Sequence, residues 1–336
     1  MTQDAGAPPL SQSLKDLLAR FEAGEPLALA RSISLVEDQA EGFESLLHLL
    51  HDGLGRARRL GITGPPGAGK STLTSGLAKL LRDQGETVGV IAVDPSSPFT
   101  GGALLGDRVR MDELATEPGI FIRSMASRGS HGGLSATTRE AADLMDAFGF
   151  DRIILETVGV GQSELEIASQ ADTTVVVLVP ESGDGIQAMK AGLMEVADLF
   201  VVNKADRPGA DRLKKEIGIV NGLRTGSHLA SPPQPVAAWD PPVLMTVASG
   251  GDGIPELAAE VDRHHAWLSS TGSLQSRRAA AAAEHARIVL ERAVTRRGAE
   301  AWRDWIEEVG QDAGLAGRSP YETARILTAR ICRDDQ

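Results

Sequence analysis

The sequence predicts an α/β domain built on a doubly wound, mostly parallel sheet, with helical extensions at both ends. Between residues 58 and 267, short apolar runs alternate with stretches of helical periodicity. Several runs are continuously apolar and β-branched, as at 174–179, which is typical of parallel strands buried on both faces. The segments between the runs then serve as crossover helices on the two faces of the sheet.

Seven apolar runs are predicted to be strands. Each is short and is followed by a stretch rich in Gly, Pro, Asp or Asn, which marks the end of a strand. The predicted strands are 60–63, 88–93, 120–124, 152–156, 173–179, 199–203 and 243–247.

Polar clusters follow four of these runs, at 64–71, 94–97, 156–161 and 203–206. In open parallel sheets, ligands bind beyond the carboxyl ends of the strands. Since all four clusters would meet at that edge, the sequence predicts a single ligand site there.

Helices are expected at both ends of the chain. Apolar residues recur every three or four positions from 10 to 54, with breaks at 24–26 and at Gly42. A long helix is expected over 275–297, which contains no Gly or Pro, and a helical pattern continues from 301 to 332. The predicted organisation is an N-terminal helical extension at 1–57, the main domain at 58–268 and a C-terminal helical arm at 269–336.

The C-terminal arm is too short to bury a large core alone. We therefore predict that it packs against a second copy of the chain as a dimerisation arm. The alternative is an arm that folds back onto its own domain.

Composition disfavours several classes of partner. The chain has 336 residues, 42% of them hydrophobic, and a formal net charge of −12, which disfavours nucleic acid and anionic membranes. Cys332 is the single cysteine, so an internal disulfide cannot form. The start of the chain lacks the pattern of a signal peptide, and no apolar stretch is long enough to span a bilayer. A cytoplasmic location is expected.

A phosphate-binding loop is predicted directly after the first strand. Gly64, Gly69, Lys70 and Ser71 match the pattern G-x-x-x-x-G-K-[ST], between an apolar run and a helical stretch. Glycines let backbone N–H groups approach phosphates, the lysine adds a positive charge, and the Ser71 hydroxyl is suited to Mg²⁺. The predicted nucleotide-binding residues of this loop are Gly64, Pro65, Pro66, Gly67, Ala68, Gly69, Lys70, Ser71 and Thr72.

A base-reading element is predicted at Asn203, Lys204 and Asp206, in the sequence N-K-x-D after a strand. A carboxylate in the plane of guanine accepts hydrogen bonds from the ring N–H and the exocyclic amine. Adenine lacks this pair of donors, so Asp206 would select GTP over ATP. The alternative is that Asp206 caps a helix N-terminus.

A second contact to the base is expected from a backbone N–H in the loop after the last strand. The predicted residues of this loop are Val247, Ala248 and Ser249.

Carboxylates for a magnesium site lie at the ends of two strands and in one loop. Mg²⁺ prefers oxygen ligands and usually takes one or two carboxylates plus phosphates and waters. We expect Ser71 to bind it directly, and Asp94, Asp107 and Glu156 to bind it directly or through waters. For Asp107, the alternative is an ion pair with a neighbouring arginine.

The segment from Glu156 to Gly159 occupies the place where Ras-like GTPases carry D-x-x-G. Val160, rather than glutamine, follows the glycine, and Gln162 lies two residues further on. A water-positioning glutamine is not expected there, so unaided hydrolysis should be slow.

The loop at 181–190 is rich in glycine and carries both charges. We expect Asp184, Gln187 and Lys190 to form a switch that senses a partner. The alternative is an ordinary surface connection.

With these residues in place, the chain resembles the methylmalonyl-CoA mutase-associated GTPases, the MeaB/ArgK group. The resemblance covers nearly the whole chain. It rests on the motifs at 64–72, 93–98, 101–108, 156–164 and 203–206.

The resemblance implies a P-loop GTPase of the signal-recognition-particle/MinD class that uses Mg²⁺ and binds GTP and GDP. It also implies a homodimeric chaperone that binds adenosylcobalamin-dependent methylmalonyl-CoA mutase, gates cofactor loading and protects the mutase from inactivation. Lys70, Asp94 and Glu156 would be the catalytic residues, and the loop around Asp184 and Lys190 would face the mutase. Val247 stands where members of the family often carry serine.

Two other functions remain open at this point. A nickel-type metal-insertion GTPase would need Cys or clustered His to carry the metal, and the chain has one Cys and no such cluster. An ATP-using kinase linked to amino-acid transport would need to bind adenine, and Asp206 argues against that.

Overall fold

The computed structural model describes residues 11–95, 114, 116–127, 133–157, 167–180, 192–225, 238–309 and 318–331. The chain divides into two compact units, Met1–Ala279 and Ala280–Gln336. The boundary falls within helix α12 (Ser273–Val309). Within the described ranges, none of the helices combines the length and apolar character needed to cross a bilayer.

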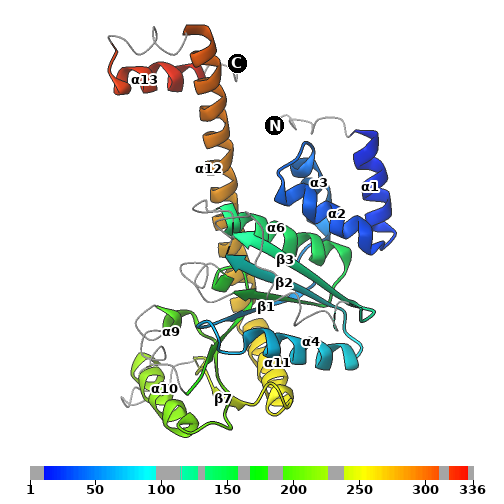
Figure 1. Ribbon diagram of the computed structural model, residues 1–336, viewed down its shortest axis with the longest axis vertical. Helices are drawn as coiled ribbons and strands as arrows, with labels where there is room; N and C mark the ends of the chain where they lie inside the picture. The colour runs from blue at the N-terminus through cyan, green and yellow to red at the C-terminus, as the bar shows by residue number, and fades with distance from the viewer. Residues whose placement is uncertain are drawn as a thin grey trace. The chain divides into compact units, whose positions relative to one another are not determined.

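The first unit is organised around a seven-stranded sheet with the strand order β3-β2-β4-β1-β5-β6-β7 (Figure 1). Every neighbouring pair of strands is parallel, which confirms the predicted fold class. The strands are β1 (Arg58–Thr63), β2 (Val88–Pro95), β3 (Ile120–Ser127), β4 (Arg152–Thr157), β5 (Thr173–Leu178), β6 (Leu199–Asn203) and β7 (Val243–Thr246).

One face of the sheet packs against α4 (Lys70–Asp83) and α11 (Ile254–Thr271), which lie side by side in Figure 1. Side chains of a strand alternate between faces, so every second residue of a strand enters this layer. Leu60 and Ile62 of β1 do so, together with Leu73 and Leu77 of α4.

The opposite face is covered by two groups of helices. Over β2, β3 and β4 lie α6 (Gly133–Phe148) and the N-terminal helices. Over β5 and β6 lie α9 (Leu193–Val196) and α10 (Ala210–Thr225), where Phe200 is fully buried. The sheet is therefore buried on both faces, as the apolar runs predict.

The N-terminal extension forms three helices, and both predicted breaks are confirmed. They are α1 (Gln12–Glu22), α2 (Pro26–Glu37) and α3 (Phe43–Leu50), followed by the short turn η1 (His51–Gly53). Pro26 occupies the first turn of α2, where its missing N–H costs nothing, and Gly42 precedes α3 with φ 90°. Phe21 meets Phe148 of α6 edge to face, so these helices belong to the core of the first unit.

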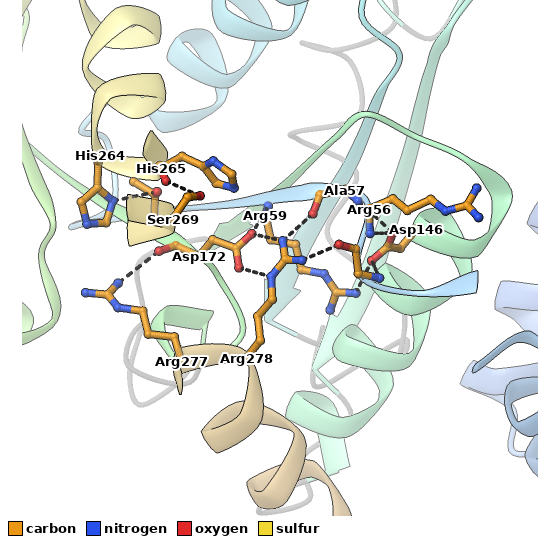
Figure 2. Close-up of polar contacts among 12 residues, drawn as sticks. Arg56, Ala57, Arg59, Asp146, Asp172, His264, His265, Ser269, Arg277 and Arg278 are labelled. Carbon is orange, nitrogen blue, oxygen red and sulfur yellow. Dashed lines mark hydrogen bonds and ion pairs between the residues drawn. The ribbon is translucent and has the colours of Figure 1, made fainter. Parts of the chain in front are cut away.

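The amino-terminal edge of the sheet is held by buried ion pairs (Figure 2). The guanidinium of Arg59 donates to Asp143 at 2.7 Å and to Asp146 at 3.0 Å. The Asp146 carboxylate also accepts the backbone N–H groups of Arg56 and Ala57. Each charge is thereby paired and hydrogen-bonded, as burial of a charge requires.

The first turns of α12 are bound to the same edge by two arginines. Arg277 donates through both terminal nitrogens to Asp198, at 2.9 and 2.8 Å, and Arg278 donates to Asp172 at 2.8 and 2.7 Å. Burial by itself raises the pKa of Asp172, but the hydrogen bond and charge of Arg278 outweigh it and hold that pKa below its usual value. Asp172 directly precedes β5 and Asp198 directly precedes β6, so the helix start is fixed to two neighbouring strands.

The second unit contains the rest of α12 and α13 (Pro320–Ile331). The sequence pattern predicts a helix that ends at residue 297, whereas α12 continues without a break to Val309. Gly298 lies inside this helix, at a cost of only about 1 kcal/mol relative to alanine, which explains why it does not end the helix. Trp305 is buried and lies against Trp302, with ring centroids 5.4 Å apart and ring planes tilted by 34°.

A neutral histidine is buried at the sheet's amino-terminal edge. His264 is 0% exposed, and its Nδ1 lies 2.9 Å from the Thr173 hydroxyl, while Nε2 lies 3.4 Å from Asp198. The rings of Trp239 and Trp267 cover it. Burial is the largest influence and lowers the pKa of His264 to about 4, against the opposing charge of Asp198.

This environment predicts a loss of stability in mild acid. The unfolded chain binds a proton at His264 near pH 6.5 and the folded chain only near pH 4, so stability is full above 6.5 and falls as the pH drops toward 4. Between pH 7 and pH 5, His264 should lower the free energy of unfolding by about 2 kcal/mol. Urea unfolding at both pH values should show this loss in the wild type and a smaller loss in His264→Gln.

The control for this experiment is His48→Gln, because His48 is exposed on α3. That variant should lose as much stability as the wild type between the two pH values. An equal loss in His264→Gln would contradict the account of the buried imidazole.

Candidate functional site

The predicted phosphate-binding loop connects the end of β1 to the start of α4, at the carboxyl edge of the sheet. Gly64 has φ 139°, and a Cβ at this position would overlap the carbonyl oxygen of Val177 in β5. Gly69 caps the N-terminus of α4 with φ 87°. Both conformations favour glycine, and both bring backbone close to the neighbouring strands.

Lys70 is buried, with 5% of its surface exposed. Its Nζ donates to the carbonyl oxygens of Gly64 at 2.8 Å and of Pro65 at 3.0 Å. The ammonium is therefore held inside the loop, next to the N-terminus of α4. A helix N-terminus and a fixed positive charge together suit a phosphate chain.

Ser71 and Glu156 meet across the edge of the sheet. The Ser71 hydroxyl donates to Oε1 of Glu156 at 2.6 Å, and Glu156 is 4% exposed. Glu156 pairs in register with Ile62, two residues before the loop begins, so the sheet brings the backbone of Glu156 beside the loop. Two oxygen donors at this spacing fit Mg²⁺, which needs few protein ligands when phosphates and waters supply the rest.

The structure describes less of the other two predicted metal ligands, Asp94 and Asp107. Asp94 lies in β2, where its backbone pairs in register with Ala126 of β3. Asp107 lies outside the described residues, as do Asp184, Gln187 and Lys190 of the predicted partner switch. In the described part of the chain, no group of three or more His, Cys, Asp or Glu residues is arranged to hold a metal.

Asn203 links the loops after β1 and β7 at this edge. Its amide nitrogen donates to the carbonyl oxygen of Ala68 in the phosphate-binding loop at 2.8 Å. Its amide oxygen accepts from the Thr246 hydroxyl at 3.0 Å and from the Ala248 N–H at 3.1 Å. The buried amide thus uses both ends to fix the loops after β1 and β7.

Lys204 and Asp206 follow on the surface of the same edge. Lys204 adopts φ 56°, which is rare for a residue with a side chain, and its Nζ donates to the carbonyl oxygen of Gly67 at 2.8 Å. Asp206 is exposed, and α10 begins only at Ala210, so Asp206 is not the N-cap of that helix. Its carboxylate lies on the loop that Asn203 and Lys204 bind to the phosphate-binding loop.

Two of the backbone N–H groups in the loop after β7 already form hydrogen bonds within the protein. The N–H of Val247 donates to the carbonyl oxygen of Asp252, and that of Ala248 donates to Asn203. Among the described residues, the N–H of Ser249 has no such partner. Of the three predicted base contacts, Ser249 is the one whose N–H remains for a base oxygen.

Three threonines that the sequence motifs do not reveal also belong to the site. Thr246 orients Asn203, while Thr63 and Thr157 are fully buried and hydrogen-bonded to each other at 3.1 Å. Thr63 immediately precedes Gly64, and Thr157 immediately follows Glu156. The strand-end positions of these residues are the sequence feature that could have indicated them.

The fold and the site define a P-loop nucleotide-binding protein of the GTPase type. Comparison with known proteins supports this class. Residues 29–302 match the family model described as methylmalonyl Co-A mutase-associated GTPase MeaB. The chain belongs to this MeaB family.

Relatives and a solved structure extend the match over nearly the whole chain. A putative GTPase of Pyrococcus horikoshii is 42% identical over 320 residues, which cover 95% of this chain and 99% of the relative. The GTPase ArgK of Escherichia coli is 39% identical over 268 residues, covering 78% of this chain and 79% of ArgK. The crystal structure of an LAO/AO transport system kinase is similar with a TM-score of 0.66 and 30% identity, covering 97% of this chain and 100% of that one.

A mouse protein named methylmalonic aciduria type A homolog, mitochondrial, is 36% identical over 273 residues. The matched region covers 76% of this chain and 64% of the mouse protein.

Proposed function

We propose that this protein hydrolyses GTP and acts as a chaperone for adenosylcobalamin-dependent methylmalonyl-CoA mutase, gating cofactor loading and protecting the mutase from inactivation. The observation that carries the GTPase part is the joint arrangement of the phosphate-binding loop and the base-reading loop, which Asn203 and Lys204 bind together. Membership of the MeaB family supports the choice of client.

Different residues of the site would bind the phosphates, recognise the base and position the loops. Lys70 and the amides of the loop would bind the outer phosphates, since this is where the positive charge and the helix N-terminus meet. Asp206 would accept the two hydrogen bonds of guanine, and the N–H of Ser249 would meet the base oxygen. Asn203 positions both loops without needing to contact the nucleotide.

Ser71 and Glu156 would hold Mg²⁺ together with Asp94, Asp107 and the phosphates. When bound, the ion neutralises negative charge that builds up on the transferred phosphoryl group. The contribution of the protein is to fix the two oxygens at the edge of the sheet, with Glu156 directed by the register between β1 and β4.

The client is tested by mixing purified protein and mutase. The proposal predicts a complex on size-exclusion chromatography and a GTPase rate that rises at least about tenfold when mutase is added, because unaided hydrolysis lacks a positioned glutamine. Substitution of Lys190 by alanine in the predicted partner switch should reduce this stimulation. No complex and no stimulation would contradict the chaperone assignment while leaving GTP binding intact.

The proposed homodimer places the C-terminal arm against a second copy. Leu290 and Val294 of the second unit are 63% and 58% exposed, and they are four residues apart on α12. Residues at that spacing share one helix face. An apolar pair exposed on one face of a helix is suited to burial against another chain.

The dimer is tested by light scattering after size-exclusion chromatography. The wild type should have twice the mass of one chain, and Leu290→Glu with Val294→Glu should have the mass of one chain. Arg287→Glu with Glu291→Arg exchanges exposed charges in the same helix and is the matched control, which should remain dimeric. A monomeric wild type would rule the proposal out.

A further inference from the structure

The phosphate-binding loop and the end of β4 are joined in a closed ring of peptide links and hydrogen bonds. The hydrogen bonds are Lys70 to the Gly64 carbonyl at 2.8 Å, Ser71 to Glu156 at 2.6 Å, and Thr157 to Thr63 at 3.1 Å. In order, the ring passes through Thr63, Gly64, Lys70, Ser71, Glu156 and Thr157.

The Thr63–Thr157 hydrogen bond is the part of this ring that faces the protein interior. Both residues are 0% exposed, and each is the last residue of its strand. They follow Ile62 and Glu156, which are paired in register, so the hydroxyls meet one step beyond the paired strands. The bond therefore links the two strand ends where the predicted phosphate and metal groups begin.

The position of the Thr63–Thr157 pair connects it to the spacing between Ser71 and Glu156. Ser71 and Glu156 come from different elements, so the distance between their oxygens depends on how the phosphate-binding loop sits relative to the end of β4. Mg²⁺ requires nearly ideal octahedral geometry and tolerates displaced ligands poorly. Phosphate binding by the loop amides and Lys70 does not require the carboxylate of Glu156.

We infer that Thr63 and Thr157 are positioning residues for the Mg²⁺ site, and that their hydrogen bond sets the spacing between Ser71 and Glu156. This inference rests on the proposed function. It assigns the pair to the metal-dependent part of nucleotide binding and not to the metal-independent part.

The test measures the affinity of the full chain for a fluorescent, non-hydrolysable GTP analogue, with Mg²⁺ and with the ion removed by a chelator. The variant is Thr63→Val with Thr157→Val, because replacing both partners by apolar groups of the same shape leaves no unpaired hydroxyl. Thr157→Ser keeps the hydroxyl. Thr174→Val is the matched control, since Thr174 is a buried residue of β5 that lies outside this ring.

In the wild type, Thr157→Ser and Thr174→Val, Mg²⁺ should raise the affinity by the same factor. In the double valine variant, this factor should be roughly five- to tenfold smaller, while the affinity without Mg²⁺ stays unchanged. Hydrolysis should change in the same way: the double valine variant should need a higher Mg²⁺ concentration than the wild type to reach half of its maximal rate.

An unchanged Mg²⁺ factor in the double valine variant would overturn the inference and leave the proposed function standing. Equal losses with and without Mg²⁺, or failure of that variant to fold while Thr174→Val folds, would assign the pair a purely structural role and overturn the inference too. A wild type that does not bind the GTP analogue would overturn both.

Discussion

Replacing Lys70 by methionine is expected to weaken GTP binding by about 100-fold and to remove measurable hydrolysis. The ammonium is buried between the carbonyl oxygens of Gly64 and Pro65, and Lys70 is the one cationic residue in the sequence 64–71. Methionine keeps the apolar stem of the side chain and removes the ammonium group with its charge and its hydrogen bonds. Titration with a fluorescent GTP analogue and a phosphate-release assay measure the two effects.

The matched control for Lys70→Met is Lys79→Met. Lys79 lies on the same helix, α4, and is exposed, so its loss should leave both binding and hydrolysis at the wild-type level. Thermal unfolding of both variants separates loss of the phosphate contact from loss of the fold. Equal GTP affinities in the two variants would show that Lys70 does not bind the phosphates.

Replacing Asp206 by asparagine is expected to reduce the preference for GTP over ATP by at least about 100-fold. The carboxylate accepts two hydrogen bonds from guanine, and asparagine at the same place offers one acceptor and one donor. Xanthine carries a carbonyl where guanine carries the exocyclic amine, so the same variant should gain affinity for xanthosine triphosphate. Isothermal titration with the three nucleotides measures both changes.

Asp211→Asn is the control for Asp206→Asn, because Asp211 is also exposed and lies in the first turn of α10. It should keep the preference for GTP and show no gain for the xanthine nucleotide. If Asp206→Asn behaves like this control, another group reads the base. A wild type that binds ATP as tightly as GTP would instead favour the ATP-using kinase.

The strands could be predicted from sequence because their apolar runs are short and bounded by turn residues. Predicted and observed limits agree closely for β1, β4, β5 and β6, in which nearly every residue is buried. They agree less well for β2 and β3, which continue to Pro95 and Ser127, since the two strands pair with each other beyond the predicted ends. Neighbouring strands, not local propensity, set those ends.

The site could be predicted only where a short motif specifies it. The phosphate-binding loop and Asn203 were found because their residues are close in sequence. The Thr63–Thr157 bond joins residues 94 apart, and Arg278 meets Asp172 across 106 residues. Such pairs depend on strand order, which the sequence pattern leaves open. The same limit applies to the direct hydrogen bond between Ser71 and Glu156, which requires the ends of β1 and β4 to lie side by side.

The most direct test is a crystal structure of the wild type with Mg²⁺ and a non-hydrolysable GTP analogue. The account predicts triphosphate density along residues 64–71, with the base between Asp206 and the N–H of Ser249 and the metal density between Ser71 and Glu156. Nucleotide bound at any other place on the protein, or the base turned away from Asp206, would contradict it.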